Sequence, residues 1–148
     1  MAETVFNVAK QRIMQGLTDL DGGDLRAVLI TGNKTGVNVA TLTDLAAIDA
    51  LNAGATNFNA NRIVMTSLAV TIVTGAGQAG AATITFPAEA VVALGILIFD
   101  NNAQAGTPPT GDGSRFPIMF SDTGFGAGVD LTSGGMTYSL PNGWLRGT

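Results

Sequence analysis

The segment Gly75–Gly80, with the sequence GAGQAG, is the part of this chain that most resembles a motif with chemistry attached to it. It satisfies the pattern G-x-G-x-x-G, follows an apolar stretch, and has Asp100 twenty residues further on, as a dinucleotide-binding fingerprint would. That site requires the third glycine to open a helix whose N-terminal amides face the pyrophosphate. The sequence that follows, AATITFPAE, instead alternates with period two, is rich in β-branched residues and contains Pro87. We therefore interpret the segment as a glycine-rich hairpin loop and expect no cofactor.

A second candidate is the acidic turn that contains Asp19, Asp21 and Asp24. Several carboxylates on a short flexible segment are typical of a calcium loop. The spacing differs from that of an EF-hand loop, because Gly23 and Asp24 stand where an acid or amide and then a glycine are required, and no glutamate closes the loop. The sequence therefore favours solvated turn residues and no metal site.

Paired carboxylates could also serve as the acid and base of a glycoside hydrolase, with Glu89 and Asp100, or Asp122 and Asp130, as the pairs. Any chain with eleven acids contains such pairs. The chain has no histidine and no cysteine, so it lacks the usual neutral-pH base and the thiolate nucleophile. No serine stands in a nucleophile-elbow sequence either. We expect a protein that is not an enzyme.

The charged residues exclude further classes of partner. The formal net charge is −4, and the seven bases are scattered along the chain: Lys10, Arg12, Arg26, Lys34, Arg62, Arg115 and Arg146. Phosphate binding needs a concentrated positive surface, so nucleic acid is not an expected partner. The longest apolar run, Ala90–Phe99, is about half of the roughly 20 residues of a membrane-spanning helix, and predicts a buried strand instead.

Two helices are predicted in the first third of the chain. Val5, Ala9, Ile13 and Leu17 recur at four-residue spacing and predict an N-terminal helix within residues 1–17, with Thr4 as its cap and Gly16 as its stop. A short second helix is predicted near residues 43–53, where Thr43 precedes apolar residues at helical spacing and Gly54 follows.

The rest of the 148-residue chain predicts short strands. Period-two alternation, apolar runs and turn residues place them at Leu25–Ile30, Ile63–Leu68, Ala69–Val73, Ala82–Phe86, Gly95–Asp100, Phe116–Phe120 and Met136–Leu140. The second half has no room for crossover helices, so the pairing should be antiparallel. The prediction is one domain, 1–148, that is mainly β: an antiparallel β-sandwich or flattened barrel spanning 25–145, with the N-terminal helix and the second short helix.

The order of these features resembles that of small structural proteins of tailed-bacteriophage virions. The chain opens with the helical VFNVAKQRIMQG, passes a DLD turn into LRAVLIT, continues through GILIFDNNA and FPIMFSDTG, and closes with SGGMTYSLPNGWLRGT. The likeness runs from Val5 to Leu145. The segment from Lys34 to Asn61 departs from it, with the second helix and an Asn/Ala-rich stretch in place of a variable loop.

The resemblance implies a non-enzymatic virion component that assembles in the host cytoplasm. Within that class it implies a capsid decoration or cement protein on the capsid surface, which binds the major capsid protein and stabilises the phage head. Lack of cysteine agrees with folding in a reducing compartment. A homo-oligomer is also expected, with a trimer at local threefold positions as one form. The alternative is a tail, fibre or adhesin-type module that binds a receptor or carbohydrate.

Candidate contacts with a capsid or other partner come from the loops 101–115 and 122–129. They are Pro108, Pro109, Arg115 and Phe125, chosen because glycine- and proline-rich surroundings suggest exposure. Trp144 could stack on a sugar ring, although a late-strand tryptophan more often closes the core.

Overall fold

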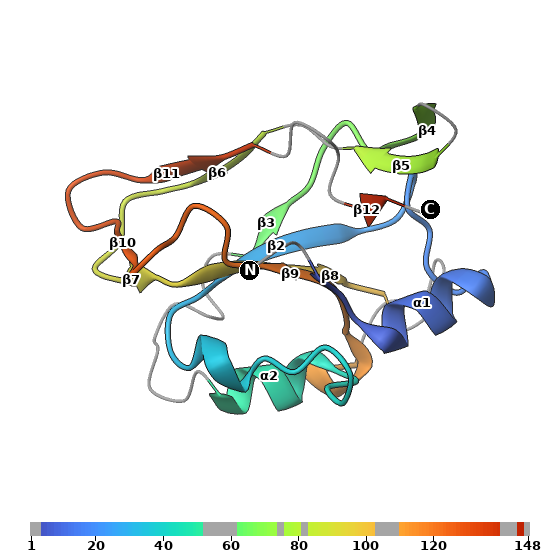
Figure 1. Cartoon of the computed structure of the whole chain (residues 1–148), viewed down its shortest axis with the longest axis horizontal. Helices are drawn as coiled ribbons and strands as arrows, with labels where there is room; N and C mark the ends of the chain where they lie inside the picture. The colour runs from blue at the N-terminus through green and yellow to red at the C-terminus, as the bar shows by residue number, and fades with distance from the viewer. Residues whose placement is uncertain are drawn as a thin grey trace.

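A computed structural model describes residues 4–51, 62–73, 76–80, 83–102, 110–139 and 145–146. Its centre is a five-stranded antiparallel sheet in the order β1-β9-β8-β2-β3 (Figure 1). The strands of this sheet are β1 (Thr4–Val5), β9 (Phe116–Ser121), β8 (Gly95–Asp100), β2 (Leu25–Ile30) and β3 (Ile63–Val64).

The three long strands of the central sheet form the core. All six residues of β8 are buried, and so are five of the six residues in each of its neighbours, β2 and β9. Strands buried on both faces read as continuous apolar runs in the sequence, which is why LRAVLI, GILIFD and FPIMFS were recognisable. A β-bulge between Ile98 and Phe99 shifts the register of β8 against β9.

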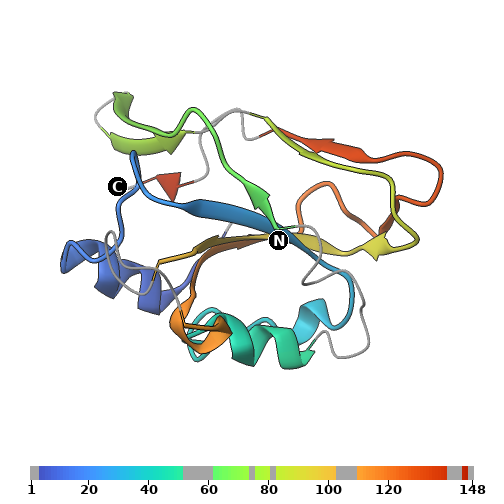
Figure 2. The ribbon, with the colours of Figure 1, turned by 180° about the vertical axis from the view of Figure 1, so that it is seen from behind.

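Three small antiparallel sheets accompany the central one. They pair β10 (Val129–Asp130) with β7 (Val92–Ala93), β11 (Met136–Tyr138) with β6 (Ile84–Phe86), and β12 (Leu145–Arg146) with β5 (Ala76–Gly80) and β4 (Ala69–Val73). Figures 1 and 2 place β6–β11 and β4–β5 on one side of the central sheet and helix α2 on the other, with helix α1 beside one end of the sheet. Ile84 and Phe86 are buried and Thr83 and Thr85 exposed, so β6 alternates as predicted.

The first helix, α1 (Asn7–Met14), is shorter than the predicted 1–17. Thr4 is not its cap, because Thr4 pairs with Phe120 in strand β1. Phe6 occupies the N-cap position with an extended backbone and no side-chain cap bond, and its ring is fully buried. Gly16 follows the helix with a φ of +68°, the left-handed conformation expected of a glycine stop.

The second helix, α2 (Leu45–Leu51), lies where the sequence predicted it. Asp44 supplies the side-chain cap, because its Oδ1 accepts a hydrogen bond of 2.9 Å from the Ala47 N–H. Leu45 and Ile48 are fully buried and attach the helix to the core. Among the described residues, neither helix has the length and apolarity needed to cross a membrane.

The mainly β class, the antiparallel pairing and the two helices are confirmed. Strand β3 covers only Ile63–Val64 of the predicted Ile63–Leu68, and β11 ends at Tyr138. The strands are divided among one larger and three small sheets, and the finer expectation of a sandwich or flattened barrel stays a prediction.

Gly95 allows β8 and β9 to pack closely, which gives a test of the core. A Cβ atom at Gly95 would lie 2.6 Å from Cε2 of Phe120 and 3.0 Å from the carbonyl oxygen of Ser121. Because the Phe120 ring is itself buried, the Gly95→Ala variant should lose about 1–3 kcal/mol of unfolding free energy, measured by urea denaturation.

Gly80→Ala is the matched control, because Gly80 is also a strand glycine and a Cβ there meets no atom of the described residues within 4 Å. Its stability should stay within about 0.5 kcal/mol of the wild type. Equal losses in the two variants would contradict close packing at Gly95.

Candidate functional site

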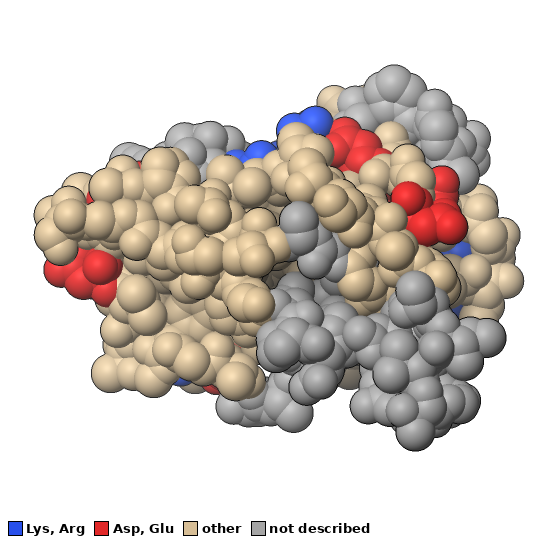
Figure 3. Space-filling model, turned by 90° about the horizontal axis from the view of Figure 1, so that it is seen from above, with Lys and Arg blue, Asp and Glu red and all other residues tan. Residues whose placement is uncertain are grey.

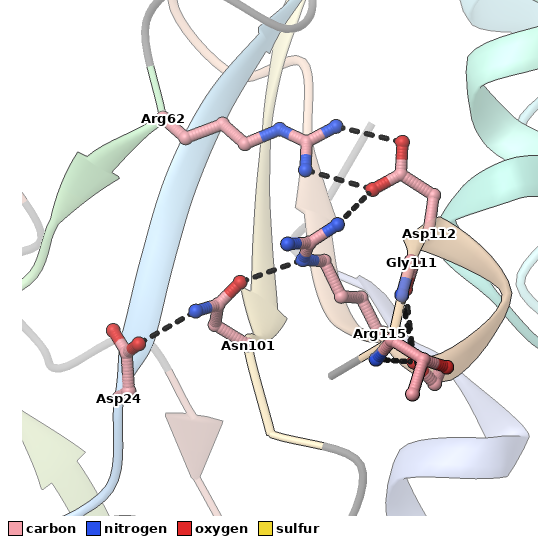
Figure 4. A network of polar contacts seen from close by, with 8 residues as sticks. Asp24, Arg62, Asn101, Gly111, Asp112 and Arg115 are labelled. Carbon is pink, nitrogen blue, oxygen red and sulfur yellow. Dashed lines mark hydrogen bonds and ion pairs between the residues drawn. The ribbon is translucent and has the colours of Figure 1, made fainter. Parts of the chain in front are cut away.

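A group of charged side chains joins segments that are far apart in the sequence (Figure 4). Arg62 precedes β3, Asp112 begins the 3-10 helix η2 (Asp112–Ser114), and Arg115 precedes β9. Both guanidinium Nη atoms of Arg62 donate to the Asp112 carboxylate, at 2.8 and 2.9 Å, and Nη1 of Arg115 donates to the same carboxylate at 2.6 Å. A bidentate pair with a second arginine on the same carboxylate fixes the orientation of all three side chains.

The same group extends to Asn101, which follows β8, and to Asp24, which precedes β2. Nε of Arg115 donates to Oδ1 of Asn101 at 2.7 Å, and Nδ2 of Asn101 donates to Oδ2 of Asp24 at 2.6 Å. Asp24 also accepts two hydrogen bonds of 2.9 Å from Arg26. We call this group the arginine–aspartate network, which consists of Arg62, Asp112, Arg115, Asn101, Asp24 and Arg26.

The pKa shifts of the two aspartates in the network are those expected of ion pairs that hold a structure together. Hydrogen bonds from Arg62 lower the pKa of Asp112. Burial acts in the opposite direction, and the hydrogen bond from Arg115 lowers the pKa further. In the same way, hydrogen bonds from Arg26 lower the pKa of Asp24, burial raises it, and the hydrogen bond from Asn101 lowers it further. A carboxyl group with a lowered pKa stays ionised at neutral pH, so it serves as a counter-ion better than as a general acid.

A second group of charged side chains, which is buried, connects α1 to the end of β8. Asp100 is 1% exposed, and its Oδ2 accepts a hydrogen bond of 2.8 Å from the Thr18 hydroxyl. The same oxygen lies 3.7 Å from Nη2 of Arg12, whose guanidinium stacks 3.7 Å above the Phe116 ring centroid. Burial lowers the pKa of Arg12 and the charge of Asp100 opposes that change. Asp100 interacts with Arg12 and Thr18, so the pairing of Glu89 with Asp100, which the sequence analysis considered and did not favour, gains no support.

The predicted contact residues fall in different environments. Arg115 is held in the arginine–aspartate network, with 23% of its side chain exposed. The expectation that Phe125 is exposed was wrong. It is 2% exposed and stacks on Tyr138 with ring centroids 5.6 Å apart, in a turn where Gly124 and Gly126 have positive φ. Pro108 and Pro109 lie outside the described residues.

The structure places most of the glycine motif in a strand. Ala76–Gly80 is not a loop but strand β5, paired with β4 from Ala69↔Gly80 to Val73↔Ala76. The interpretation as part of a hairpin was right and its assignment as the loop was wrong, because glycine and alanine can enter a ladder wherever a partner strand supplies the hydrogen bonds. The next described residues, from Thr83 onward, lead into strand β6 and not into the helix that a dinucleotide-binding fingerprint requires.

The acidic turn is held by its own backbone. Oδ1 of Asp19 accepts hydrogen bonds from the N–H groups of Asp21 and Gly22, at 3.2 and 3.1 Å, while Asp24 belongs to the arginine–aspartate network. In the part of the chain that the structure describes, no three His, Cys, Asp or Glu side chains gather in a way that could hold a metal ion. Trp144 lies outside that part.

The arginine–aspartate network was missed from the sequence. Its members look like isolated charges, and their separations in the chain are large, at 50 residues for Arg62 and Asp112 and 77 for Asp24 and Asn101. Only the placement of charges at strand ends could have served as a signal, because adjacent strands bring such positions together.

Comparison with known proteins adds no relative: no protein-family model, curated protein or solved structure matches the chain.

The buried pair of Arg12 and Asp100 predicts a strong mutational effect. Asp100→Asn should lower the unfolding free energy by about 1–3 kcal/mol, because it removes the buried carboxylate charge that lies 3.7 Å from the Arg12 guanidinium and accepts the Thr18 hydroxyl. Urea denaturation at pH 7 measures the change. Asp130→Asn, at an exposed position of β10, is the control and should unfold much like the wild type, because asparagine keeps the Oδ1 that accepts the Thr132 N–H. A wild-type value for Asp100→Asn would show that the pair contributes nothing.

The arginine–aspartate network predicts a pH dependence. A carboxyl group whose folded pKa lies below its unfolded value stabilises the fold above the unfolded value, and that contribution is lost as the pH falls through the folded pKa. For Asp112 the loss begins near its ordinary value of 3.8 and is complete below its lowered pKa. The Asp112→Asn variant should be less stable at pH 7 and lose less stability between about pH 5 and 2 in urea denaturation, because it has no carboxyl group to protonate. A pH profile parallel to that of the wild type would contradict this role.

Proposed function

We propose that this protein is a non-enzymatic structural component of a tailed-bacteriophage virion, and specifically a capsid decoration or cement protein. On this proposal it assembles in the host cytoplasm, binds the major capsid protein as a homo-oligomer and stabilises the head from the capsid surface. The supporting observation is that four of the segments which carry the resemblance fold together in or against the central sheet.

Those segments form one structural unit. VFNVAKQRIM begins in β1 and becomes α1, LRAVLI becomes β2, GILIFD becomes β8 and FPIMFS becomes β9. They lie side by side in the central sheet or against its end, and the buried contact of Arg12 with Asp100 joins the first to the third. Much of the likeness therefore coincides with the core of the fold, whereas its closing segment contributes β11, which pairs with β6 in a separate small sheet.

The use of charge also supports a structural role. The aspartates of the two charged groups, Asp24, Asp100 and Asp112, all contact arginine, so their charges hold segments of the chain together. A cement protein contacts the lattice at many repeated points, and such contacts add through avidity even when each one is weak. A rigid body with few surface charges suits that task.

The proposal is tested on virions of the phage that carries the gene. Quantitative mass spectrometry of purified particles should find this chain at a copy number comparable to that of the major capsid protein. Particles that lack it should lose infectivity faster on heating or osmotic shock, because the lattice loses its additional contacts.

Each alternative gives a different result in the same measurement. A few copies per particle would indicate the tail or a fibre and overturn the decoration role. Absence from the particles would contradict the virion assignment as a whole. Particles carrying the Gly80→Ala chain serve as the control, because this change leaves the core contacts in place.

A further inference from the structure

The longest stretch of the chain without a charged residue runs from Ile63 to Ala88. It contains β3, β4, β5 and β6, and most of it lies on the side of the central sheet opposite α2 (Figure 1). Seen from that side, much of the described surface carries no charged side chain, and the acidic groups lie toward the two ends of the molecule (Figure 3). Lack of charge is typical of buried strands, yet several residues of this stretch are exposed, among them Val64, Ala69, Val70 and Thr85.

Strand β4 (Ala69–Val73) is the edge of its sheet among the described strands. It pairs with β5 on one side along its whole length. Residues of an antiparallel ladder alternate between pairs that exchange hydrogen bonds and pairs that do not, so every second residue of β4 directs its N–H and C=O groups away from β5.

This edge lacks the features that usually protect one. Native edge strands carry lysine, proline, inward charges or bulges, or are very short. β4 has five residues, AVTIV, most of them β-branched and none of them charged or proline, and Val70 is 51% exposed. Such an edge is prone to pair with another strand.

We propose that β4 pairs with β4 of a second copy of this chain, antiparallel and about a twofold axis at Thr71. The two three-stranded sheets then join into one six-stranded sheet, and all five residues of each strand are paired, with Val70 opposite Ile72 of the other copy.

The charge pattern favours a second copy over a different partner. At a twofold contact each residue near the axis meets its own copy, so any charge there faces a like charge. The chain has a net charge of −4, and the stretch around β4 is the longest one free of both signs. A contact with a different protein would not require an uncharged surface, because a charge on this chain could face an opposite charge on the partner. The contact gives a dimer, in place of the trimer that a threefold site would suit, and it does not depend on the virion role.

Sedimentation equilibrium of the purified chain tests the proposal. The wild type should have twice the mass of one chain at micromolar concentration. Val70→Lys places two like charges across the contact and should shift the protein to the monomer, with a loss of at least tenfold in dimer affinity. Thr85→Lys, which adds the same charge at an exposed strand position of β6, should remain dimeric. Circular dichroism confirms that both variants are folded.

A cross-link tests the register. Residues opposite each other in an antiparallel pair have Cα atoms about 4.5–5.5 Å apart, within the range of a disulfide. Because the chain has no cysteine, Thr71→Cys should form a single covalent dimer on mild oxidation, and Thr85→Cys should not.

Three outcomes would overturn the proposal. They are a wild type that is monomeric at all concentrations, equal dissociation in the Val70→Lys and Thr85→Lys variants, or no covalent dimer from Thr71→Cys. A monomeric wild type whose Val70→Lys variant fails to bind virions would assign the edge to a virion protein instead.

Discussion

The complete burial of β8 is the constraint on which the rest of the structure depends. All six of its residues are buried, so both faces of the central sheet must be covered by other parts of the chain. Helix α2 lies on one side, and the small sheets that contain β6 and β5 lie on the other. Burying apolar strands in this way stabilises the fold by roughly 25 cal/mol for each Å² of apolar surface removed from water.

The same burial makes Asp100 a special case. It ends β8 inside the core, where an ionised carboxylate without a partner would be strongly unfavourable. Arg12 and Thr18 compensate it, and both come from the N-terminal part of the chain. The position of α1 is therefore coupled to the end of β8. The arginine–aspartate network does the same for η2, β2 and the start of β3, so these charged residues connect segments that are distant in the sequence.

Because many of the charged side chains pair with one another inside the fold, a large part of the described surface is uncharged. This surface is relevant both to the proposed decoration role and to the proposed pairing of β4. A decoration protein and a self-pairing edge each need surface that can be covered by another protein at little desolvation cost. The stretch from Ile63 to Ala88 offers such a surface, whereas the acidic groups visible in Figure 3 lie toward the two ends of the molecule.

Predictions that depend on local pattern were accurate. The apolar runs at β2, β8 and β9 and the alternation at Ile84 and Phe86 specified strands, because a buried or half-buried strand needs that spacing of apolar residues. Predictions that depend on distant partners were less accurate. Thr4 has the chemistry of a helix cap, but its backbone pairs with Phe120 in the central sheet.

The candidate contact residues show the same limit. Phe125 sits among glycines in a turn, and nothing in its sequence neighbourhood reveals that its ring stacks on Tyr138. The members of the arginine–aspartate network are likewise mostly separated by tens of residues and meet only because β2, β3, β8 and β9 belong to one sheet.

The amino-acid sequence by itself determined the mainly β class, the two helices, the principal buried strands and the scarcity of charge. Strand order, the pairing of AGQAG as β5, the partners of each aspartate and the burial of Phe125 were decided by the tertiary structure. The physical reason is that periodicity and capping act within a few residues, whereas hydrogen-bond ladders, ion pairs and ring contacts join positions that become neighbours only after the chain has folded.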